Sequence, residues 1–436
     1  MTVTVPSRTS AERPTRTRHF VIVFAVTLAI ITYLDRVCMS FASTDVQRDL
    51  SLSDKQMGFI FSSFIAVYAL FEIPSGFLGD WMGPRRVLMR IVIWWSFFTA
   101  FIGATWNFVS LAVTQMLFGM GEAGAFPNLT KAFTTWLPPQ ERTRAQGIMW
   151  LSARWGGAFT PMLVALLLRR MSWRLAFVTF GSVGVVWALL FYRWFRDNPR
   201  DHPKVNAAEL ELLRGTEGMA GGHAHVPWRR FVASRQVWLL CAQYFCLSYG
   251  WYFYITWLPK YLRAARHVEV GTSAVLAGLP LFLGGIGCFV GGAIARRMNV
   301  WTGNTSKTRR TLAYIGFSGA CAFLLLSSWL EDPLLAMFSM GLASFCNDLV
   351  MPGAWGACMD VGGRYAGTLS GTMNMMGNIG GALSPFVIGL ILDATHNWNI
   401  PFYVSAAIYF MGVFCWMALD PVTPLEQAEP AKLAPV

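Results

Sequence analysis

The chain has 436 residues, of which 55% are hydrophobic and 13% are charged. Soluble domains carry about 25% charged residues, so this composition excludes a soluble globular protein and indicates a polytopic helical membrane protein. The formal net charge is +12, but most Lys and Arg residues lie in the termini and loops on the side of residue 1. That distribution is the positive-inside pattern of membrane proteins and does not indicate a nucleic-acid partner.

Twelve apolar segments have the length and composition of membrane-spanning helices. They run approximately over residues 20–41, 56–78, 87–106, 108–132, 143–168, 174–195, 236–262, 273–296, 310–330, 334–358, 366–392 and 400–419. The predicted fold class is an all-α membrane protein with 12 transmembrane helices in two six-helix halves, arranged as a parallel repeat.

The predicted spans divide the chain into five parts. These are an N-terminal tail (1–19), a first six-helix half (20–195), a linker (196–235), a second six-helix half (236–420) and a C-terminal tail (421–436). Asn206 and Glu209 have capping-box spacing, which predicts a short surface helix in the linker. The positive-inside pattern predicts that both termini are cytoplasmic. No cleavage site follows the first apolar run, so we expect it to be retained.

The first span contains two adjacent opposite charges, Asp35 and Arg36. At about 1.5 Å per residue, Asp35 lies roughly 22 Å along the segment that begins at Phe20. A charge at that depth costs several kcal/mol unless it is paired or faces a wet cavity. Adjacent side chains diverge by about 100° around a helix, so these two cannot simply neutralise each other. Arg36 is therefore a candidate to bind a substrate carboxylate and Asp35 to bind a proton; an ion pair with a neighbouring helix is the structural alternative.

The loop after the second span reads GFLGDWMGPRR over residues 76–86. It resembles the loop motif of the major facilitator superfamily, Gly-x-x-x-Asp-(Arg/Lys)-x-Gly-x-(Arg/Lys)-(Arg/Lys), with Trp81 at the usual basic position. The glycines permit a tight turn and close helix contact, and the charges can form a network that stabilises the outward-open state. The predicted gating residues are Gly76, Asp80, Gly83, Arg85 and Arg86. The alternative is an ordinary positive-inside loop. The equivalent loop in the second half, 291–310, lacks the aspartate, so we expect that network to be incomplete.

Two further spans of the first half carry charges. Glu122 shares a face of the fourth span with Gln115, and a carboxyl group buried there can take up and release a proton. A permanently protonated glutamate in a helix–helix hydrogen bond is the alternative. Arg154 lies in the fifth span beside two glycines that allow a ligand or helix to approach. Substrate-anion binding is the preferred role for Arg154, and a salt bridge or a lipid headgroup contact is the alternative.

The second half offers uncharged polar side chains. Asn374 and Asn378 form one stripe of the eleventh span, where amides suit sugar hydroxyls or helix-packing hydrogen bonds. Tyr252 in the seventh span, and Tyr68 in the second, are aromatic candidates for packing against a sugar face, or for interfacial anchoring. The substrate-binding candidates are therefore Arg36, Arg154, Tyr68, Gln115, Tyr252, Asn374 and Asn378.

Two acids are left without a firm role. Asp348 in the tenth span can pair with an arginine from another span or bind a further proton. Glu72, near the cytoplasmic end of the second span, is expected to pair with loop arginines. The histidines lie in or near loops, which does not support a histidine relay. The eight cysteines lie in apolar runs without metal-ligand spacing, so no metal or cofactor is expected other than the proton as coupling ion.

Three motifs narrow the family. Residues 34–36 (LDR), 121–127 (GEAGAFP) and 197–203 (DNPRDHP) resemble the anion:cation symporter family, and the resemblance covers essentially 20–420. Bacterial members take up sugar acids such as hexuronates, aldonates and aldarates. The resemblance implies a carrier in the bacterial inner membrane, with Glu122 at a position that binds a proton in relatives. We expect a monomer in the lipid bilayer.

The chain departs from these relatives in the fourth span. Many sugar-acid carriers place an arginine two turns before the glutamate, where this chain has Gln115. Arg154 lies on the fifth span, where those relatives often carry an amide. We infer that the charge has moved between facing helices, that the cavity has kept a net positive character, and that the substrate binds between Arg36 and Arg154.

These observations predict a transporter and not an enzyme, since no nucleotide-binding loop, catalytic triad or metal cluster appears in the sequence. The expected function is import of an organic anion, such as a sugar acid, by proton symport with rocker-switch alternating access. The coupling protons are expected on Asp35 and Glu122. One alternative is a proton-coupled exporter, although 156–161 lacks the spacing of the usual exporter motif. The other is a transporter-like nutrient receptor, which would be expected to carry a long signalling tail.

Overall fold

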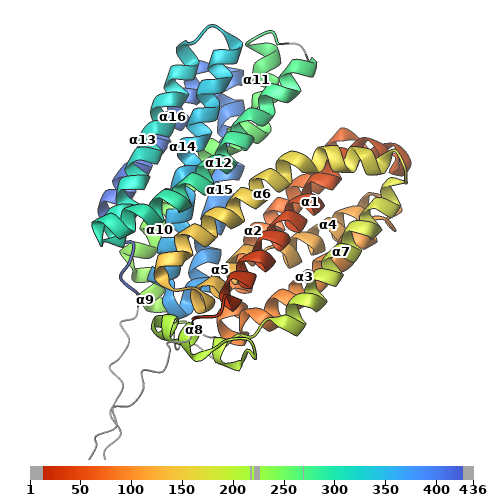
Figure 1. Ribbon diagram of the computed structural model, residues 1–436. Coiled ribbons are helices and arrows are strands. Elements are labelled where there is room, and N and C mark those ends of the chain that lie inside the picture. Colours follow the sequence, from red (N-terminus) through yellow and green to blue (C-terminus); the bar gives the residue numbers. More distant parts are fainter. Residues whose placement is uncertain (1–12, 217–218, 220–225, 269, 426–436) are drawn as a thin grey trace, which may run out of the picture.

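The computed structural model describes residues 13–216, 219, 226–268 and 270–425, and these residues form helices and connecting loops without a β-strand (Figure 1). The outer parts of the two predicted tails, 1–12 and 426–436, lie outside the described residues. The expected all-α architecture is confirmed within the described part of the chain.

The first half contains seven helices. They are α1 (Thr17–Leu50), α2 (Asp54–Met82), α3 (Pro84–Ile102), α4 (Phe108–Glu122), α5 (Ala125–Trp136), α6 (Pro139–Leu168) and α7 (Trp173–Trp194). Helices α4 and α5 together occupy the predicted fourth span, which is interrupted at Gly124. Side-chain caps begin α2 at Ser53 and α4 at Asn107, where each accepts a hydrogen bond from a backbone N–H of the first turn.

The second half contains six long helices and the short helix α11 among the described residues. They are α10 (Arg235–Thr256), α11 (Leu258–Ala264), α12 (Val270–Thr302), α13 (Thr305–Trp329), α14 (Pro333–Gly362), α15 (Ala366–Thr395) and α16 (Asn399–Ala418). Helices α10 and α11 form the predicted seventh span, broken at Trp257. With α4–α5 and α10–α11 each taken as one span, the described residues contain the twelve predicted spans.

A stricter test by length and hydropathy alone accepts seven spans among the described residues, or eight if the bent helix α6 is included. It counts α14 and α15 as one run, Pro333–Thr395. The predicted spans that this test does not accept include the two broken pairs, α4–α5 and α10–α11.

The linker contains the short helices η1 (Pro199–Asp201), α8 (Ala207–Leu212), η2 (Arg214–Thr216) and α9 (Trp228–Ala233). The predicted surface helix is α8, and Asn206 Oδ1 caps it by accepting the Glu209 N–H at 3.0 Å.

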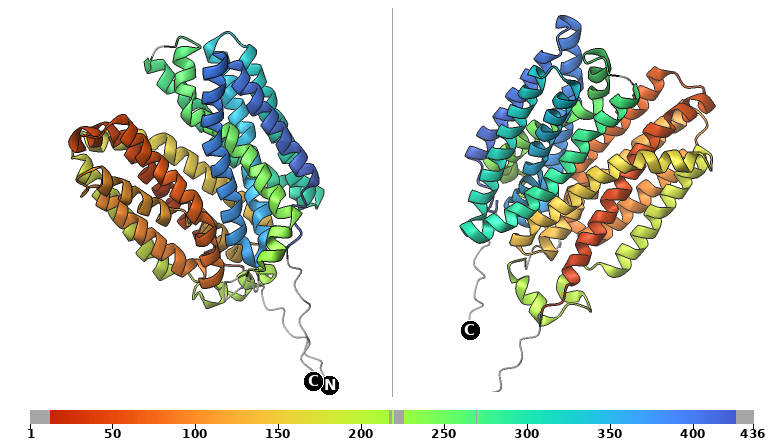
Figure 2. Two further views of the ribbon diagram at one scale, coloured as in Figure 1. Left: turned by 180° about the vertical axis from the view of Figure 1, so that it is seen from behind. Right: turned by 45° about the horizontal axis from the view of Figure 1, so that its top comes forward.

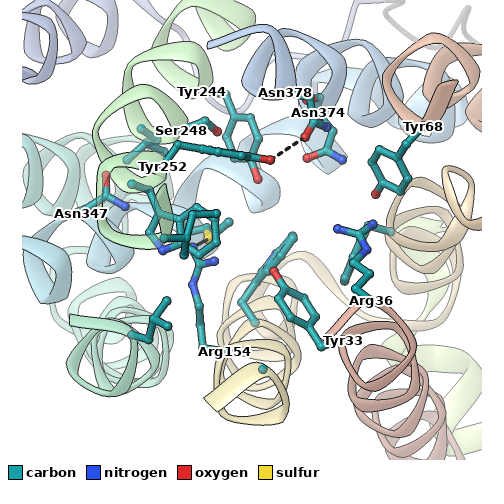
Figure 3. Close-up of a pocket in the computed structure, with 18 of the residues that line it drawn as sticks. Tyr33, Arg36, Tyr68, Arg154, Tyr244, Ser248, Tyr252, Asn347, Asn374 and Asn378 are labelled. Carbon is teal, nitrogen blue, oxygen red and sulfur yellow. Dashed lines mark hydrogen bonds between the residues drawn. The ribbon is translucent and has the colours of Figure 1, made fainter. Parts of the chain in front are cut away.

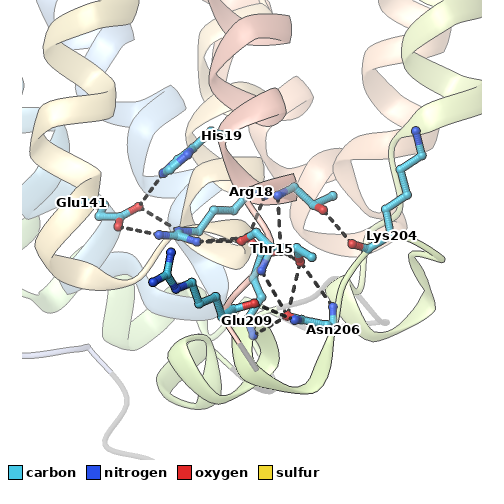
Figure 4. A network of polar contacts seen from close by, with 9 residues as sticks. Thr15, Arg18, His19, Glu141, Lys204, Asn206 and Glu209 are labelled. Carbon is cyan, nitrogen blue, oxygen red and sulfur yellow. Dashed lines mark hydrogen bonds and ion pairs between the residues drawn. The ribbon is translucent and has the colours of Figure 1, made fainter. Parts of the chain in front are cut away.

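Polar contacts hold α8 against the first half (Figure 4). Arg18 at the start of α1 pairs with Glu209 of α8 and with Glu141 at the start of α6, each at 3.1 Å. Burial disfavours the charge of Glu141, but the hydrogen bond and charge of Arg18 outweigh it and lower the pKa of this carboxyl group. The linker helix is thus fixed to the first bundle by ion pairs.

The two halves form two separate bundles that meet at one end (Figures 1 and 2). We call the end that carries α8 and α9 the linker end; the bundles diverge toward the opposite end. Glycines allow the close approach: a Cβ added at Gly76 of α2 would collide with the carbonyl oxygen of Gly367. On the other side, a Cβ at Gly147 of α6 would lie 3.1 Å from the Cα of Gly292 on α12.

Candidate functional site

A cavity of about 380 Å³ lies between the two halves (Figure 3). Ligand sites in proteins have volumes of about 300–1,000 Å³, so a small organic molecule fits here. Its wall comes from α1, α2, α5 and α6 of the first half and from α10, α12, α14 and α15 of the second. The charged and polar lining residues, with the aromatic ones that carry a polar atom, are Tyr33, Arg36, Ser40, Tyr68, Trp150, Arg154, Tyr244, Ser248, Trp251, Tyr252, Asn347, Asn374 and Asn378.

Arg36 presents a partly exposed guanidinium group to this cavity. Its Nε donates to Glu122 Oε2 at 2.9 Å, and its Cζ lies 4.4 Å from the centroid of the Tyr68 ring. One fourth of the Arg36 side chain is exposed. The single bond to Glu122 and the aromatic contact orient the guanidinium group while leaving donors that an anion in the cavity can use.

The two predicted proton sites lie behind Arg36 and do not line the cavity. Glu122 is fully buried on α4. Asp35 is 3% exposed, and neither of its carboxylate oxygens has a hydrogen bond within the described residues. Its polar neighbours are Trp95 on α3 and Glu122. The divergence of adjacent side chains thus separates Asp35, in the interior of the first bundle, from Arg36 at the cavity wall.

The structure changes the expectation for Arg154. Its Nε and Nη2 donate to the two carboxylate oxygens of Asp348 on α14 at 2.8 and 3.0 Å, and its Cζ lies 4.0 Å from the Trp251 ring centroid. Only 4% of the Arg154 side chain is exposed. Arg154 lines the cavity, but its charge is already paired by a two-bond ion pair between the halves. It is therefore not a free anchor for an anion, and the alternative role proposed for Asp348, pairing with an arginine of another span, is the one observed.

Glu72 lies elsewhere than expected. It is fully buried and accepts hydrogen bonds from the side-chain amides of Asn374 and Asn378 on α15, not from loop arginines. Tyr252 Oη donates to Asn378 Oδ1 at 3.2 Å (Figure 3). Both asparagines line the cavity, but their N–H donors face Glu72. The alternative role predicted for the two asparagines, hydrogen bonding between helices, is therefore the one observed for their N–H groups. The predicted pairing of Glu72 with loop arginines is wrong.

Gln115 lies away from the cavity, and several acids lie behind its wall. Gln115 is buried on α4 and is absent from the cavity wall, so its predicted contact with substrate is not supported. The ionisable side chains in and directly behind the wall comprise two arginines, Arg36 and Arg154, and four carboxyl groups, Asp35, Glu72, Glu122 and Asp348. The charged residues that line the wall itself are the two arginines, and the four carboxyl groups lie behind it.

The predicted gating aspartate joins the two halves at the linker end. Asp80 accepts the backbone N–H groups of Gly367 and Thr368 at 3.0 and 2.6 Å and the Thr368 hydroxyl at 2.7 Å. Lys131 Nζ lies 3.2 Å from the same carboxylate. An acid at the first turn of α15 is stabilised by the free N–H groups of the helix terminus. Asp80 therefore caps a helix of the other half.

The arginines of the same loop do not take part in that contact. The Arg85 backbone N–H donates to Asp197 at 2.8 Å, and its guanidinium group donates to the Tyr192 carbonyl oxygen. Gly83 has φ +85°, and a Cβ there would collide with Asp197. Arg86 is exposed. The expected network between Asp80 and the loop arginines is wrong in its partners, since Arg85 ties α3 to the end of α7 within the first half.

The second half has an equivalent network that the sequence reading missed. Asp360 at the end of α14 pairs with Arg142 of α6 at 2.5 Å and with Arg309 of α13 at 2.7 Å. The acid comes from the tenth span and not from the loop at 291–310. In this network the acid lies at the end of α14, and one of its basic partners, Arg309, follows the loop at 291–310. The other partner, Arg142, belongs to the first half, so this network also joins the two halves.

The sequence profile of the Major Facilitator Superfamily matches residues 25–385. A probable sulfoacetate transporter of Cupriavidus necator is 33% identical over 95% of this chain and 96% of its own length. A hexuronate transporter of Bacillus subtilis is 27% identical over 89% of this chain and 91% of its own length. Among solved structures, a proton:xylose symporter superposes with a TM-score of 0.73 at 11% identity, covering 93% of this chain and 97% of its own; at that identity the likeness shows the fold.

The chain therefore belongs to the Major Facilitator Superfamily. It is a multi-pass membrane transporter and not an enzyme, and the predicted family and fold are confirmed.

Proposed function

We propose that this protein is a secondary active transporter that imports a small organic anion together with protons. The observation that carries the proposal is Arg36: it is a cavity-lining cation, partly exposed, and held by one bond to Glu122. A carboxylate or sulfonate group in the cavity would be bound by the guanidinium donors that Glu122 leaves free.

The coupling follows from competition for Arg36. Both Glu122 and an entering anion are stabilised by this guanidinium group, and two anions beside one cation repel each other. A proton on the Glu122 carboxyl group removes its charge and leaves Arg36 to the substrate. After the substrate leaves, loss of that proton restores the Arg36–Glu122 pair. The proton and the anion therefore load together.

The number of acids around the cavity supports the same coupling. Two arginines face four carboxyl groups, so adding an anion without protons would place further negative charge in a low-dielectric wall. Asp35 has no hydrogen bond from the described residues and is our candidate for a second proton. The loaded carrier is then closer to electroneutral, which favours movement of the halves.

The relatives support an organic acid as the substrate class. Their names include transporters of sulfoacetate, D-galactonate and hexuronate, all of which carry a carboxylate or sulfonate. Tyr244, Trp251 and Tyr252 offer aromatic faces for the remainder of the molecule, and Ser40 and Ser248 offer hydroxyl groups. A sugar acid or a short organic acid bound through its acid group to Arg36 is consistent with this lining.

The proposed direction, import, uses the orientation that the basic loops predict. The linker end is assigned to the cytoplasm of a bacterial inner membrane, since the basic loops lie there. The halves meet at that end and diverge at the other (Figures 1 and 2). In this assignment the cavity loads from outside and releases inside when the linker end opens.

The test is uptake into proteoliposomes with an imposed pH gradient, using sulfoacetate, D-galactonate and glucuronate. We expect accumulation of at least one of these anions when the exterior is acidic, and loss of accumulation in Arg36→Gln. Arg86→Gln, at an exposed position in the first turn of α3, is the matched control and should accumulate normally. Efflux driven by the gradient would show an exporter, and binding without transport would show a receptor; either result would overturn the proposal.

A further inference from the structure

The contact between α2 and α15 joins the two halves from the linker end up to the cavity. At the linker end Asp80 accepts the backbone N–H groups at the start of α15. One turn further along α2, the backbones at Gly76 and Gly367 are too close for a side chain, and a Cβ at Gly371 would collide with the Glu72 carbonyl oxygen. Glu72 itself is the last polar group of this contact before the cavity.

The Glu72 carboxylate is held by the other half through amide donors alone. Asn378 Nδ2 lies 3.1 Å from each carboxylate oxygen, and Asn374 Nδ2 donates to Oε1. No ion pair to Glu72 occurs within the described residues. This sets it apart from Glu122, Asp348 and Asp80, each of which pairs with an arginine or a lysine.

The other ionisable groups that act on Glu72 come from three helices. They are Arg36 on α1, Tyr68 on α2 itself, and Tyr244 and Tyr252 on α10. Helix α15 contributes its two amides. Asn374 and Asn378 also line the cavity, so Glu72 lies directly behind the wall and within reach of a proton that enters with the substrate.

We propose that Glu72 is a further proton-binding site, and that its protonation weakens the contact between α2 and α15 and so favours opening at the linker end. The proposal rests on the proposed proton symport, but it concerns a different acid and a different step.

The physical reason lies in the donors that Glu72 faces. An ionised carboxylate only accepts hydrogen bonds, which suits amide N–H groups on two sides. A protonated carboxyl group turns one acceptor into an O–H donor that points at donors, and so loses part of the contact. When the halves separate at the linker end, Glu72 loses both amide donors of α15. Loss of these donors disfavours the ionised form, so the arrangement without them binds the proton more tightly.

The experiment measures the distance across the linker end as a function of pH. Spin-labelled noncanonical amino acids replace the exposed Arg86 on α3 and the exposed Arg297 on α12, which leaves the native cysteines in place. Double electron–electron resonance in nanodiscs without substrate then gives the ratio of open to closed linker ends. One linked proton changes this ratio by up to about tenfold per pH unit. We expect the open fraction to rise as the pH falls in the wild type.

Glu72→Gln is expected to be more open than the wild type at neutral pH and to lose most of this pH response. Glu122→Gln should keep the response, which separates this step from the coupling at Arg36. A pH response in Glu72→Gln equal to that of the wild type would overturn the proposal. This result would leave the proposed proton symport untouched, because symport is tested by uptake driven by a pH gradient and not by the opening of the linker end.

A second variant guards against misfolding of the first. Asn378→Leu removes the amide that contacts both carboxylate oxygens of Glu72, while Glu72 itself is kept. The ionised carboxylate then loses part of its support in the closed contact, so the open fraction at neutral pH should rise and the pH response should become smaller. A folded Asn378→Leu protein with the open fraction and pH response of the wild type would contradict the proposal.

Discussion

Two arginines face the central cavity, and their surroundings differ. Arg36 makes one bond to Glu122 within its own half, and one fourth of its side chain is exposed. Arg154 makes two bonds to Asp348 of the other half and is 4% exposed. Both are arginines within predicted membrane spans. What decides whether each can bind a substrate anion is therefore its partner, and not its residue type.

The difference also separates two roles. The Arg36–Glu122 pair can stay together or exchange partners while the halves move, because both residues belong to the first bundle. The Arg154–Asp348 pair spans the halves, so it contributes to how they are held together. We therefore assign anion binding to Arg36 and a structural, inter-half role to Arg154, and the following changes test this division.

The largest effect is expected for Arg36→Gln. A bound carboxylate left without its cation in a buried site costs on the order of 3–5 kcal/mol, or at least a hundredfold in affinity. Arg36→Lys keeps the charge but loses the planar fork of donors, so its affinity should be intermediate. Calorimetry with the transported anion in detergent measures both. Near-normal affinity in Arg36→Gln would remove Arg36 as the anchor.

A smaller effect on binding, and a large one on stability, is expected at the other arginine. Arg154→Met leaves Asp348 buried without its partner and should lower the melting temperature, because breaking a buried pair costs about 3–5 kcal/mol. Replacing both residues, Arg154→Met with Asp348→Leu, removes both charges and should restore most of the stability.

The double variant also decides the role of Arg154 in binding. We expect its affinity for the anion to stay within about tenfold of the wild type. If the double variant is as stable as the wild type but binds as weakly as Arg36→Gln, then Arg154 contacts the anion and the division of roles is wrong.

The smallest of these effects is expected at the linker end. Asp80→Asn removes the charge that caps α15 and leaves Lys131 unpaired, at a cost on the order of 1.5 kcal/mol, or about a tenfold shift toward opening at that end. Labelling of an introduced cysteine at that end should become faster. Arg85→Gln is the matched comparison, since Arg85 bonds within the first half and should not shift the opening. Equal labelling in Asp80→Asn and wild type would show that Asp80 does not hold the halves together.

Much of the fold could be predicted because it follows from composition and local pattern. Apolar runs predict spans, the polar stretch at 196–235 predicts the linker, and Asn206 predicts the start of α8. Glycines and Asp80 were predicted to act between helices, and the structure gives them that role at α15.

The pairing of charges could not be predicted, because it depends on which helices of the two halves face each other. The partners of the buried acids Asp348, Glu72 and Asp360 are about 50 to 300 residues away in the sequence. The local sequence indicates only that Glu72 lies on the same face of α2 as Tyr68 and Gly76, which are four residues before and after it. The acids that lie opposite the two arginines could not be assigned for the same reason, since this requires knowing that Asp348 and Glu72 lie directly behind the cavity wall.

The central claim, that the anion and Glu122 compete for Arg36, is tested most directly by counting protons during binding. Calorimetric titration of the transported anion in buffers of different ionisation enthalpy gives the number of protons taken up. We predict uptake by the wild type near neutral pH, with about one proton fewer taken up by Glu122→Gln while that variant still binds the anion. Binding to the wild type without proton uptake, at a pH where Glu122 is ionised, would contradict the account.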